Sequence, residues 1–255
     1  MKIIIKNKNE IKLLKKACKI TSQILDEVSE IIKPGISTED INLFVHKRTA
    51  QLKATPAPLN YEGFPKSVCT SINEVICHGI PSTDVILKSG DIINVDITSI
   101  KNGFFGDASR MYFVGGREAC SDEAVKLVDF TELALEKAIE VVKPGNLFSD
   151  IGKKIEEVLK DSKTGFSIVR DYTGHGIGRS FHEAPQILHY FSNRNNIEIK
   201  EGMTFTIEPM INVGSYKTEL DKKDNWTVRT IDGSLSAQWE HTLVVTKTGA
   251  DILTI

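Results

Sequence analysis

The stretch Ile32-Lys33-Pro34-Gly35, followed by Asp40-Ile41, decides the fold because it occurs twice. The second copy, Val142-Lys143-Pro144-Gly145 followed by Asp150-Ile151, lies about 110 residues further along the chain. Self-similarity at a fixed offset is the sequence signature of a repeated structural unit. Pro-Gly ends a helix in each copy, so the repeat predicts two pairs of helices, each pair separated by a tight turn.

Apolar periodicity places a helix on each side of both turns. Within residues 8–32 apolar side chains recur at helical spacing, which predicts a first helix. Ser37, with Asp40 three residues later, resembles a capping box that opens a second helix. In the second copy the helical period runs over 121–142, and Ser149 opens a further helix to Leu159. Each half of the chain therefore begins with two helices.

Each pair of helices is followed by a strand that carries an acid. The first is predicted over 92–98 and bears Asp96, and the second is predicted over 203–208 and ends in Glu208. Successive side chains of a strand point to opposite faces. In both strands the acid lies on the less apolar face, while the other face is apolar and packs on a core.

The predicted fold class is α+β, built from duplicated helix-helix-strand-strand units around a pseudo-twofold axis. A further acidic strand in each unit carries Asp107 and Glu240. A curved antiparallel sheet with helices on its outer face and polar groups on its concave face fits this pattern, and the axis would bring the acids together. We expect a single domain over 1–255, with a short N-terminal helix at about 8–32 and pseudo-repeats at about 33–115 and 143–250.

The residues with metal-binding chemistry are four carboxylates and one imidazole: Asp96, Asp107, His175, Glu208 and Glu240. If they converge, they concentrate more negative charge than a fold holds without cations. The donor set suits Mn(II), Fe(II), Co(II) or Zn(II), and the sequence does not choose among them. Two such ions about 3.5–4 Å apart can activate a water for attack on a polarised carbonyl. Amide or ester hydrolysis is the reaction class that this predicts.

Composition narrows the partners and the compartment. The chain is 40% hydrophobic and 26% charged, with a net charge of −2, which gives no reason to expect nucleic acid or an anionic membrane as a partner. No stretch approaches the roughly 18 apolar residues of a membrane span, and lysines interrupt 1–20, so no secretory signal is expected. The four cysteines form no CxxC pair and are interpreted as free thiols in a reducing cytoplasm.

Two long stretches, 65–81 and 234–242, carry a resemblance to a known family. They include Ile76-Cys77-His78-Gly79-Ile80-Pro81 and Gln238-Trp239-Glu240-His241-Thr242. The chain resembles the type I methionine aminopeptidases from about Ile31 to Thr254. That family has the pita-bread fold with an internal duplication. The resemblance implies removal of the initiator methionine from nascent proteins whose second residue is small, by attack of metal-activated water on the peptide carbonyl.

The resemblance also implies a role for each metal-ligating residue. By that resemblance Asp107 and Glu240 bridge two divalent ions, Asp96 chelates one of them, and His175 with Glu208 holds the other. The expected cofactors are thus two divalent ions, Co, Mn, Fe or Zn.

Further roles concern catalysis and the substrate. The resemblance places His78 beside the scissile amide, where it binds substrate, and makes His182 a donor to the developing oxyanion, while Glu208 moves a proton. The positions that match the methionine pocket are Tyr61, Phe64, Cys69, Phe181 and Trp226.

The expected partners are peptides and nascent chains with an N-terminal Met, with the ribosome surface as a further candidate. A cytoplasmic monomer without a membrane or a nucleic acid sequence as partner is expected. Two alternative functions stay open: a peptidase of the same fold that cleaves before proline, and a scaffold that binds partners without catalysis. Relatives of the second kind have lost their metal ligands, whereas all four carboxylates and the imidazole are present in this sequence.

Overall fold

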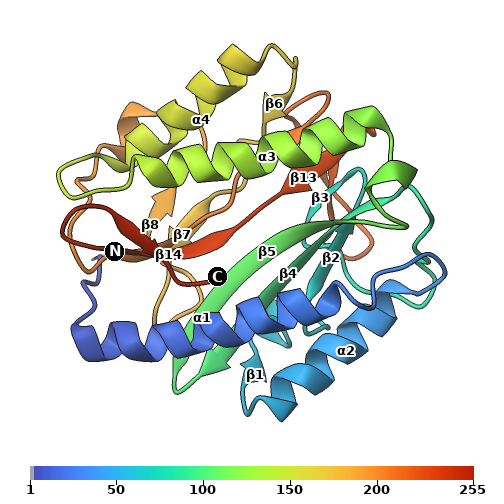
Figure 1. The fold of residues 1–255 in the computed structure, drawn as a ribbon, viewed down its shortest axis with the longest axis horizontal. Helices are drawn as coiled ribbons and strands as arrows, with labels where there is room; N and C mark the ends of the chain where they lie inside the picture. Colours follow the sequence, from blue (N-terminus) through green and yellow to red (C-terminus); the bar gives the residue numbers. More distant parts are fainter. Residues whose placement is uncertain (1–2) are drawn as a thin grey trace.

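The computed structural model describes residues 3–255, and its order of elements follows the predicted duplication (Figure 1). The first half begins with helices α1 (Lys8–Val28) and α2 (Thr38–Gln51), and the second half begins with α3 (Asp122–Glu140) and α4 (Phe148–Ser162). The first helix ends at Val28, four residues earlier than predicted. Met1 and Lys2, which begin the predicted domain, lie outside the described residues.

Both Pro-Gly turns make the same backbone hydrogen bonds. The Gly35 N–H donates to the Leu87 carbonyl at 2.8 Å, and the Gly145 N–H donates to the Ile199 carbonyl at 3.1 Å. Isolated bridges Ser37–Ile86 and Leu147–Glu198 follow in the two halves. Each turn therefore ties its helix pair to the segment that leads into an acid-bearing strand. The duplication is present in the hydrogen bonds as well as in the sequence.

The second helix of each pair begins in the same way. The Asp40 carboxylate accepts from the Ser37 N–H, and the Asp150 carboxylate accepts from the Leu147 N–H, both at 2.8 Å. The prediction that Ser149 opens α4 is thus one residue late, because α4 begins at Phe148. Ser149 is buried, and its hydroxyl donates to Asn196 Oδ1 at 2.9 Å.

The strands pair antiparallel in four sheets. In the largest sheet of the first half, β4 (Ile92–Lys101) pairs with β5 (Phe104–Phe113), β2 (Cys69–Ile72) and β1 (Thr55–Pro56). The five-stranded sheet of the second half has the order β15 (Ala250–Ile252), β14 (His241–Val245), β9 (Thr204–Ile207), β7 (Gly174–Gly176) and β8 (Glu183–Ile187). The two three-stranded sheets comprise β13 (Ser236–Gln238), β10 (Met210–Asn212) and β6 (Ser167–Ile168), and β11 (Thr218–Leu220), β12 (Val228–Thr230) and β3 (Val75–Cys77). Short 3-10 turns occupy Tyr61–Gly63, Arg117–Ala119 and Asn193–Asn195.

The two large sheets meet where β5 runs beside β14 (Figure 1). The Asp107 N–H donates to Thr242 Oγ1 at 3.2 Å, and the Glu240 N–H donates to the Ser109 carbonyl at 3.1 Å. These two hydrogen bonds hold Asp107 of the first half next to Glu240 of the second half.

Helices cover the outer face of both sheets, as predicted. Figure 1 shows α1 and α2 across the strands of the first half and α3 and α4 across those of the second. Ile93, Val95 and Ile97 of β4 are buried against the first helix pair, and Phe205 of β9 packs on Phe148 with ring centroids 4.9 Å apart. Burying these faces by the hydrophobic effect leaves the acids on the opposite, inner face.

Because α1 precedes the first Pro-Gly turn as α3 precedes the second, we propose that the repeats begin at Lys8 and Asp122 rather than at 33 and 143. The first helix then belongs to the first repeat. Among residues 3–255 no helix has the length and apolar character that crossing a membrane requires.

Candidate metal centre

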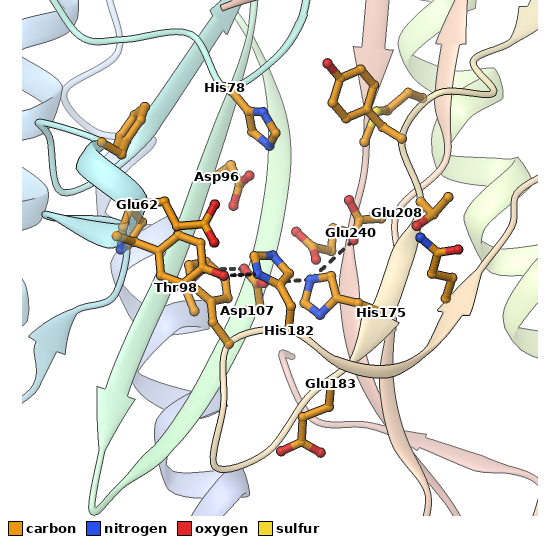
Figure 2. Close-up of a pocket in the computed structure, with 18 of the residues that line it drawn as sticks. Glu62, His78, Asp96, Thr98, Asp107, His175, His182, Glu183, Glu208 and Glu240 are labelled. Atoms are coloured by element: carbon orange, nitrogen blue, oxygen red, sulfur yellow. Dashed lines mark hydrogen bonds and ion pairs between the residues drawn. The ribbon is translucent and has the colours of Figure 1, made fainter. Parts of the chain in front are cut away.

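The five predicted metal-ligating residues all line one cavity of about 740 Å³ (Figure 2). Asp96 and Asp107 reach it from β4 and β5, and His175 reaches it from β7 in the other half. The cavity thus lies where the two repeats face each other. This is the arrangement that the pseudo-twofold symmetry predicted.

Three of the five residues offer ligand atoms that all lie within 4.8 Å of one another: Asp107, His175 and Glu240. His175 Nε2 is 3.6 Å from Asp107 Oδ2 and 3.7 Å from Glu208 Oε1. Donors that each lie about 2.1 Å from one ion are separated from one another by about 3–3.5 Å. The observed spacing therefore suits atoms that surround a cation.

Hydrogen bonds orient the carboxylates towards the cavity. Thr98 Oγ1 donates to Asp107 Oδ1 at 2.6 Å, which leaves Asp107 Oδ2 facing His175. Thr206 Oγ1 donates to Glu208 Oε1 at 2.8 Å, and Gln238 Nε2 donates to Glu208 Oε2 at 3.3 Å. Partners of this kind fix the direction of a metal-binding carboxylate.

The prediction that Glu208 and Glu240 lie within strands is wrong. Glu208 directly follows β9, and Glu240 lies between β13 and β14. Pro209 has no N–H to donate, so the ladder cannot continue directly past Glu208. The backbone N–H of Glu208 donates to Nε2 of the buried His189 instead, at 3.1 Å.

The tautomer and orientation of the His175 ring are fixed by the carbonyl of the next residue, Gly176. Its Nδ1 lies 3.0 Å from the Gly176 carbonyl, to which it can only donate, so Nε2 keeps a free lone pair. Glycines bring the strand this close to its neighbours. A Cβ on Gly174 would lie 2.5 Å from the Thr206 carbonyl oxygen, and one on Gly176 would lie 2.3 Å from that of Ala184. The absence of a side chain at these two glycines therefore allows the close backbone approach at the site.

The clustered acids strongly favour a bound cation. Burial raises the pKa of Asp96 well above its ordinary value, and the nearby charge of Asp107 raises it further. Burial and the same neighbour raise the pKa of Glu240 in the same way. Burial opposes protonation of His175, but Asp107, Glu208 and the Gly176 carbonyl together outweigh burial and raise the pKa of the imidazole. Divalent cations reverse such shifts, so the residues present fit a metal centre.

In metal-free protein, Glu208→Gln should raise the free energy of unfolding at pH 8 and leave it unchanged near pH 4. Burial raises the pKa of Glu208 from 4.5 to about 7. A carboxyl with a raised folded-state pKa makes the folded state less stable as pH rises from 4.5 through 7. A shift of this size is worth about 3 kcal/mol. Urea denaturation in chelator at both pH values measures this difference, which includes the effect of the Glu208 charge on the pKa values of Asp96, Glu240 and His175. An equal difference at both pH values would contradict the prediction.

His78 and His182 lie over the metal-ligating residues in Figure 2. The His182 ring stacks on Phe181 at 4.4 Å and lies 4.3 Å from the His175 ring. Burial, with a smaller effect of His175, lowers the pKa of His182 to about 4, and burial also lowers the pKa of His78. Both imidazoles are therefore neutral near pH 7, and each can donate from one nitrogen only.

Of the five pocket residues expected from the sequence, Tyr61, Phe64, Phe181 and Trp226 line the cavity. Cys69 is not among its lining residues in the part of the chain that the structure describes. It lies on β2 opposite Asp96.

Several residues at the site have no role in the sequence-based hypothesis. Thr98 and Thr206 share a strand face with an acid, which is a signal that could have identified them as partners of the carboxylates. Tyr172 lines the cavity with its ring 5.6 Å from that of His78, and no sequence pattern marks it. His189 has a structural role, because its Nε2 accepts the backbone N–H of Glu208.

The geometry fits a metal centre, and comparison with known proteins identifies the class as a metallopeptidase. Residues 12–247 match the model of metallopeptidase family M24, and the chain belongs to that family. It is 51% identical to the methionine aminopeptidase of Rickettsia prowazekii over 245 residues, which cover 95% of this chain and 91% of that one. The crystal structure of methionine aminopeptidase from Rickettsia prowazekii matches with a TM-score of 0.95 and 48% identity, covering 100% of both chains.

The match confirms the α+β pita-bread fold class expected from the sequence. More distant members share the architecture. The X-Pro aminopeptidase of Thermotoga maritima matches with a TM-score of 0.77 at 22% identity, and it covers 98% of this chain but only 62% of that protein. A likeness at that identity concerns the fold alone, so it does not favour cleavage before proline.

Proposed function

We propose that this protein is a metal-dependent aminopeptidase that removes the N-terminal methionine from proteins whose second residue is small. The observation that carries the proposal is the convergence of Asp96, Asp107, His175, Glu208 and Glu240 in one cavity that also holds two neutral histidines. High identity to methionine aminopeptidases over nearly the whole chain supports the choice of substrate. The scaffold alternative predicts lost ligands, and none is missing.

We propose that these five residues would hold two divalent ions, Co, Mn, Fe or Zn: Asp107 and Glu240 would be shared by both ions, Asp96 would hold one, and His175 with Glu208 would hold the other. Such ions would supply Lewis acidity and would lower the pKa of a bound water, which makes hydrolysis of a peptide bond the chemistry available here. We propose that Glu208 also accepts a proton and passes it to the departing amine.

The neutral histidines act on the substrate. His182 donates an N–H to the carbonyl oxygen as negative charge develops there. His78 binds the scissile amide. Its ring is held by Tyr172 at 5.6 Å and Trp226 at 6.1 Å, both in edge-to-face contact.

Aromatic rings form the proposed methionine pocket beside these histidines. Phe64 and Trp226 meet edge to face at 5.2 Å, and Tyr61 contacts Phe181 at 5.0 Å. Aromatic faces and edges are favourable neighbours of a thioether. Cys69, which lies on β2 opposite Asp96, stays a predicted pocket residue.

The direct test is cleavage of Met-Ala-Ser against a Xaa-Pro peptide after chelation and again after return of Mn, Fe, Co or Zn. We expect rapid release of Met from the first peptide, none from the second, and complete loss of activity in chelator. The metal that restores the highest rate is the preferred one in vitro. Cleavage of the Xaa-Pro peptide alone would overturn the proposal.

The Tyr61 hydroxyl should set the protonation of His182. The Tyr61 oxygen lies 2.8 Å from His182 Nδ1, and if the hydroxyl donates there, Nε2 carries the proton that the oxyanion needs. Loss of one neutral hydrogen bond costs about 1 kcal/mol. Tyr61→Phe is therefore expected to lower kcat by up to about tenfold with little change in KM.

Tyr112→Phe is the matched control, because its hydroxyl donates to the Leu25 carbonyl at 2.7 Å, away from the cavity. Steady-state kinetics on Met-Ala-Ser should show unchanged kcat for this variant. Equal kcat values for Tyr61→Phe and the unaltered protein would contradict the tautomer assignment.

We propose further that the protein acts as a monomer in the cytoplasm, as one catalytic domain, on nascent chains that present an N-terminal Met. We propose that the protein contacts these nascent chains at the ribosome surface. A near-neutral net charge of −2 gives no support to broad electrostatic binding of nucleic acid or membrane.

A further inference from the structure

Residues 178–183 form the loop that presents His182 to the cavity, and a buried ion pair lies at its base. Glu183 directly follows His182, and its side chain points away from the carboxylate cluster in Figure 2. Its Oε2 lies 2.5 Å from Lys6 Nζ, and the two side chains are only 7% and 3% exposed. No role in the proposed chemistry accounts for this pair.

The second carboxylate oxygen of Glu183 holds the loop itself. Oε1 accepts the backbone N–H of Arg179 at 2.9 Å and that of Ser180 at 3.2 Å. The packing at this base is tight, because a Cβ on Gly178 would lie 2.5 Å from Lys6 Cε and 2.8 Å from Glu183 Oε1. The loop is therefore closed by its own carboxylate, whose charge is neutralised by Lys6.

Lys6 is in turn fixed to the five-stranded sheet, which carries His175 on β7. Its backbone N–H donates to the Gly202 carbonyl at 2.8 Å, and its Nζ also donates to the Ile4 carbonyl at 3.3 Å. Gly202 precedes β9, and its own N–H donates to the Val245 carbonyl of β14 at 2.9 Å. The ammonium group thus connects the loop to the framework of the metal site.

We propose that Lys6 and Glu183 are positioning residues that hold His182 in register with the carbonyl oxygen of the substrate. The inference rests on the proposed aminopeptidase activity and deepens it. A donor must lie within hydrogen-bond distance of the developing oxyanion, and a misplacement of about 1 Å can cost about a hundredfold in rate. An uncompensated buried charge at the base of the loop would displace it, whereas neutralising both partners would not.

The test uses Lys6→Met, Glu183→Gln and the double variant, each loaded with the metal that best activates the unaltered protein. Kinetics on Met-Ala-Ser should show kcat lowered about tenfold to a hundredfold in Lys6→Met with KM nearly unchanged, since a misplaced oxyanion donor affects the transition state. The double variant should recover at least half of this loss on a logarithmic scale. Metal content and thermal unfolding are measured in parallel, and rates are expressed per folded, metal-loaded molecule.

A purely structural role is separated by repeating Lys6→Met in a His182→Ala background. If Lys6 acts through His182, its removal should cost no further activity there; an undiminished loss would overturn the proposal. Arg179→Gln is the control, because it removes an exposed ion pair with Glu10 from the same loop, and its kcat should stay within about twofold. An equal loss in this control would also overturn the proposal. If the unaltered protein fails to cleave Met-Ala-Ser, the proposed function itself fails, which is a different result.

Discussion

Asp107→Ala should lower kcat/KM for Met-Ala-Ser by at least about a thousandfold while leaving the fold intact. Asp107 is one of the three residues whose ligand atoms lie within 4.8 Å of one another, with one oxygen held by Thr98 and the other 3.6 Å from His175 Nε2. In the proposed arrangement Asp107 is shared by both ions, so its loss would weaken both sites. Metal-ion stabilisation of the transition state is worth several kcal/mol, and every 1.36 kcal/mol is a tenfold change in rate.

The fold should survive because Asp107 adds repulsion, not packing, to the metal-free protein. Its charge contributes to the raised pKa values of Asp96 and Glu240. Circular dichroism and urea denaturation in chelator should show unaltered or increased stability, and bound metal measured by mass spectrometry should fall. Asp161→Ala, at an exposed position of α4, is the control with full activity. Retained turnover by Asp107→Ala would refute the two-metal mechanism.

His182→Ala is expected to show the second-largest loss, about a hundredfold to a thousandfold in kcat. Removing one oxyanion donor typically costs about 2.7–4 kcal/mol in transition-state stabilisation. The ring also stacks on Phe181, so a small increase in KM is expected from the loss of that wall of the pocket. Metal content should not change, because the proposed ligands are left in place.

His46→Ala is the matched control for His182→Ala. His46 lies on the exposed side of α2, where Nδ1 contacts Ser67 Oγ at 2.9 Å, outside the residues that line the cavity. Kinetics and metal analysis on both variants separate a local effect on catalysis from a general effect on histidines. Loss of metal from His182→Ala would instead mean that this imidazole supports the metal centre.

The helices, the duplication and the five side chains that converge in the cavity could be predicted from the sequence, because each leaves a local pattern. Pro-Gly turns, capping residues and helical periodicity depend on neighbours within a few positions, and α2 begins where Ser37 and Asp40 predicted. The strand β4 also kept its predicted faces, with Ile93, Val95 and Ile97 in the core and Asp96 on the cavity side.

Other features depend on contacts between distant residues and could not be predicted. The position of Glu240 between β13 and β14 depends on the pairing of β13 with β10 and of β14 with β9. The hydroxyl of Tyr61 reaches His182 across 121 positions, and Lys6 reaches Glu183 across 177. No periodicity or motif links such pairs.

The sequence by itself determined which side chains are available for chemistry and that two similar halves present them. Only the tertiary structure decided how those side chains are oriented, protonated and held. The physical reason is that pKa values, tautomers and ligand distances depend on burial and on charges brought together from both halves. Asp96 has an ordinary carboxyl group in the sequence and a strongly perturbed one in the cavity, where the second half closes over it.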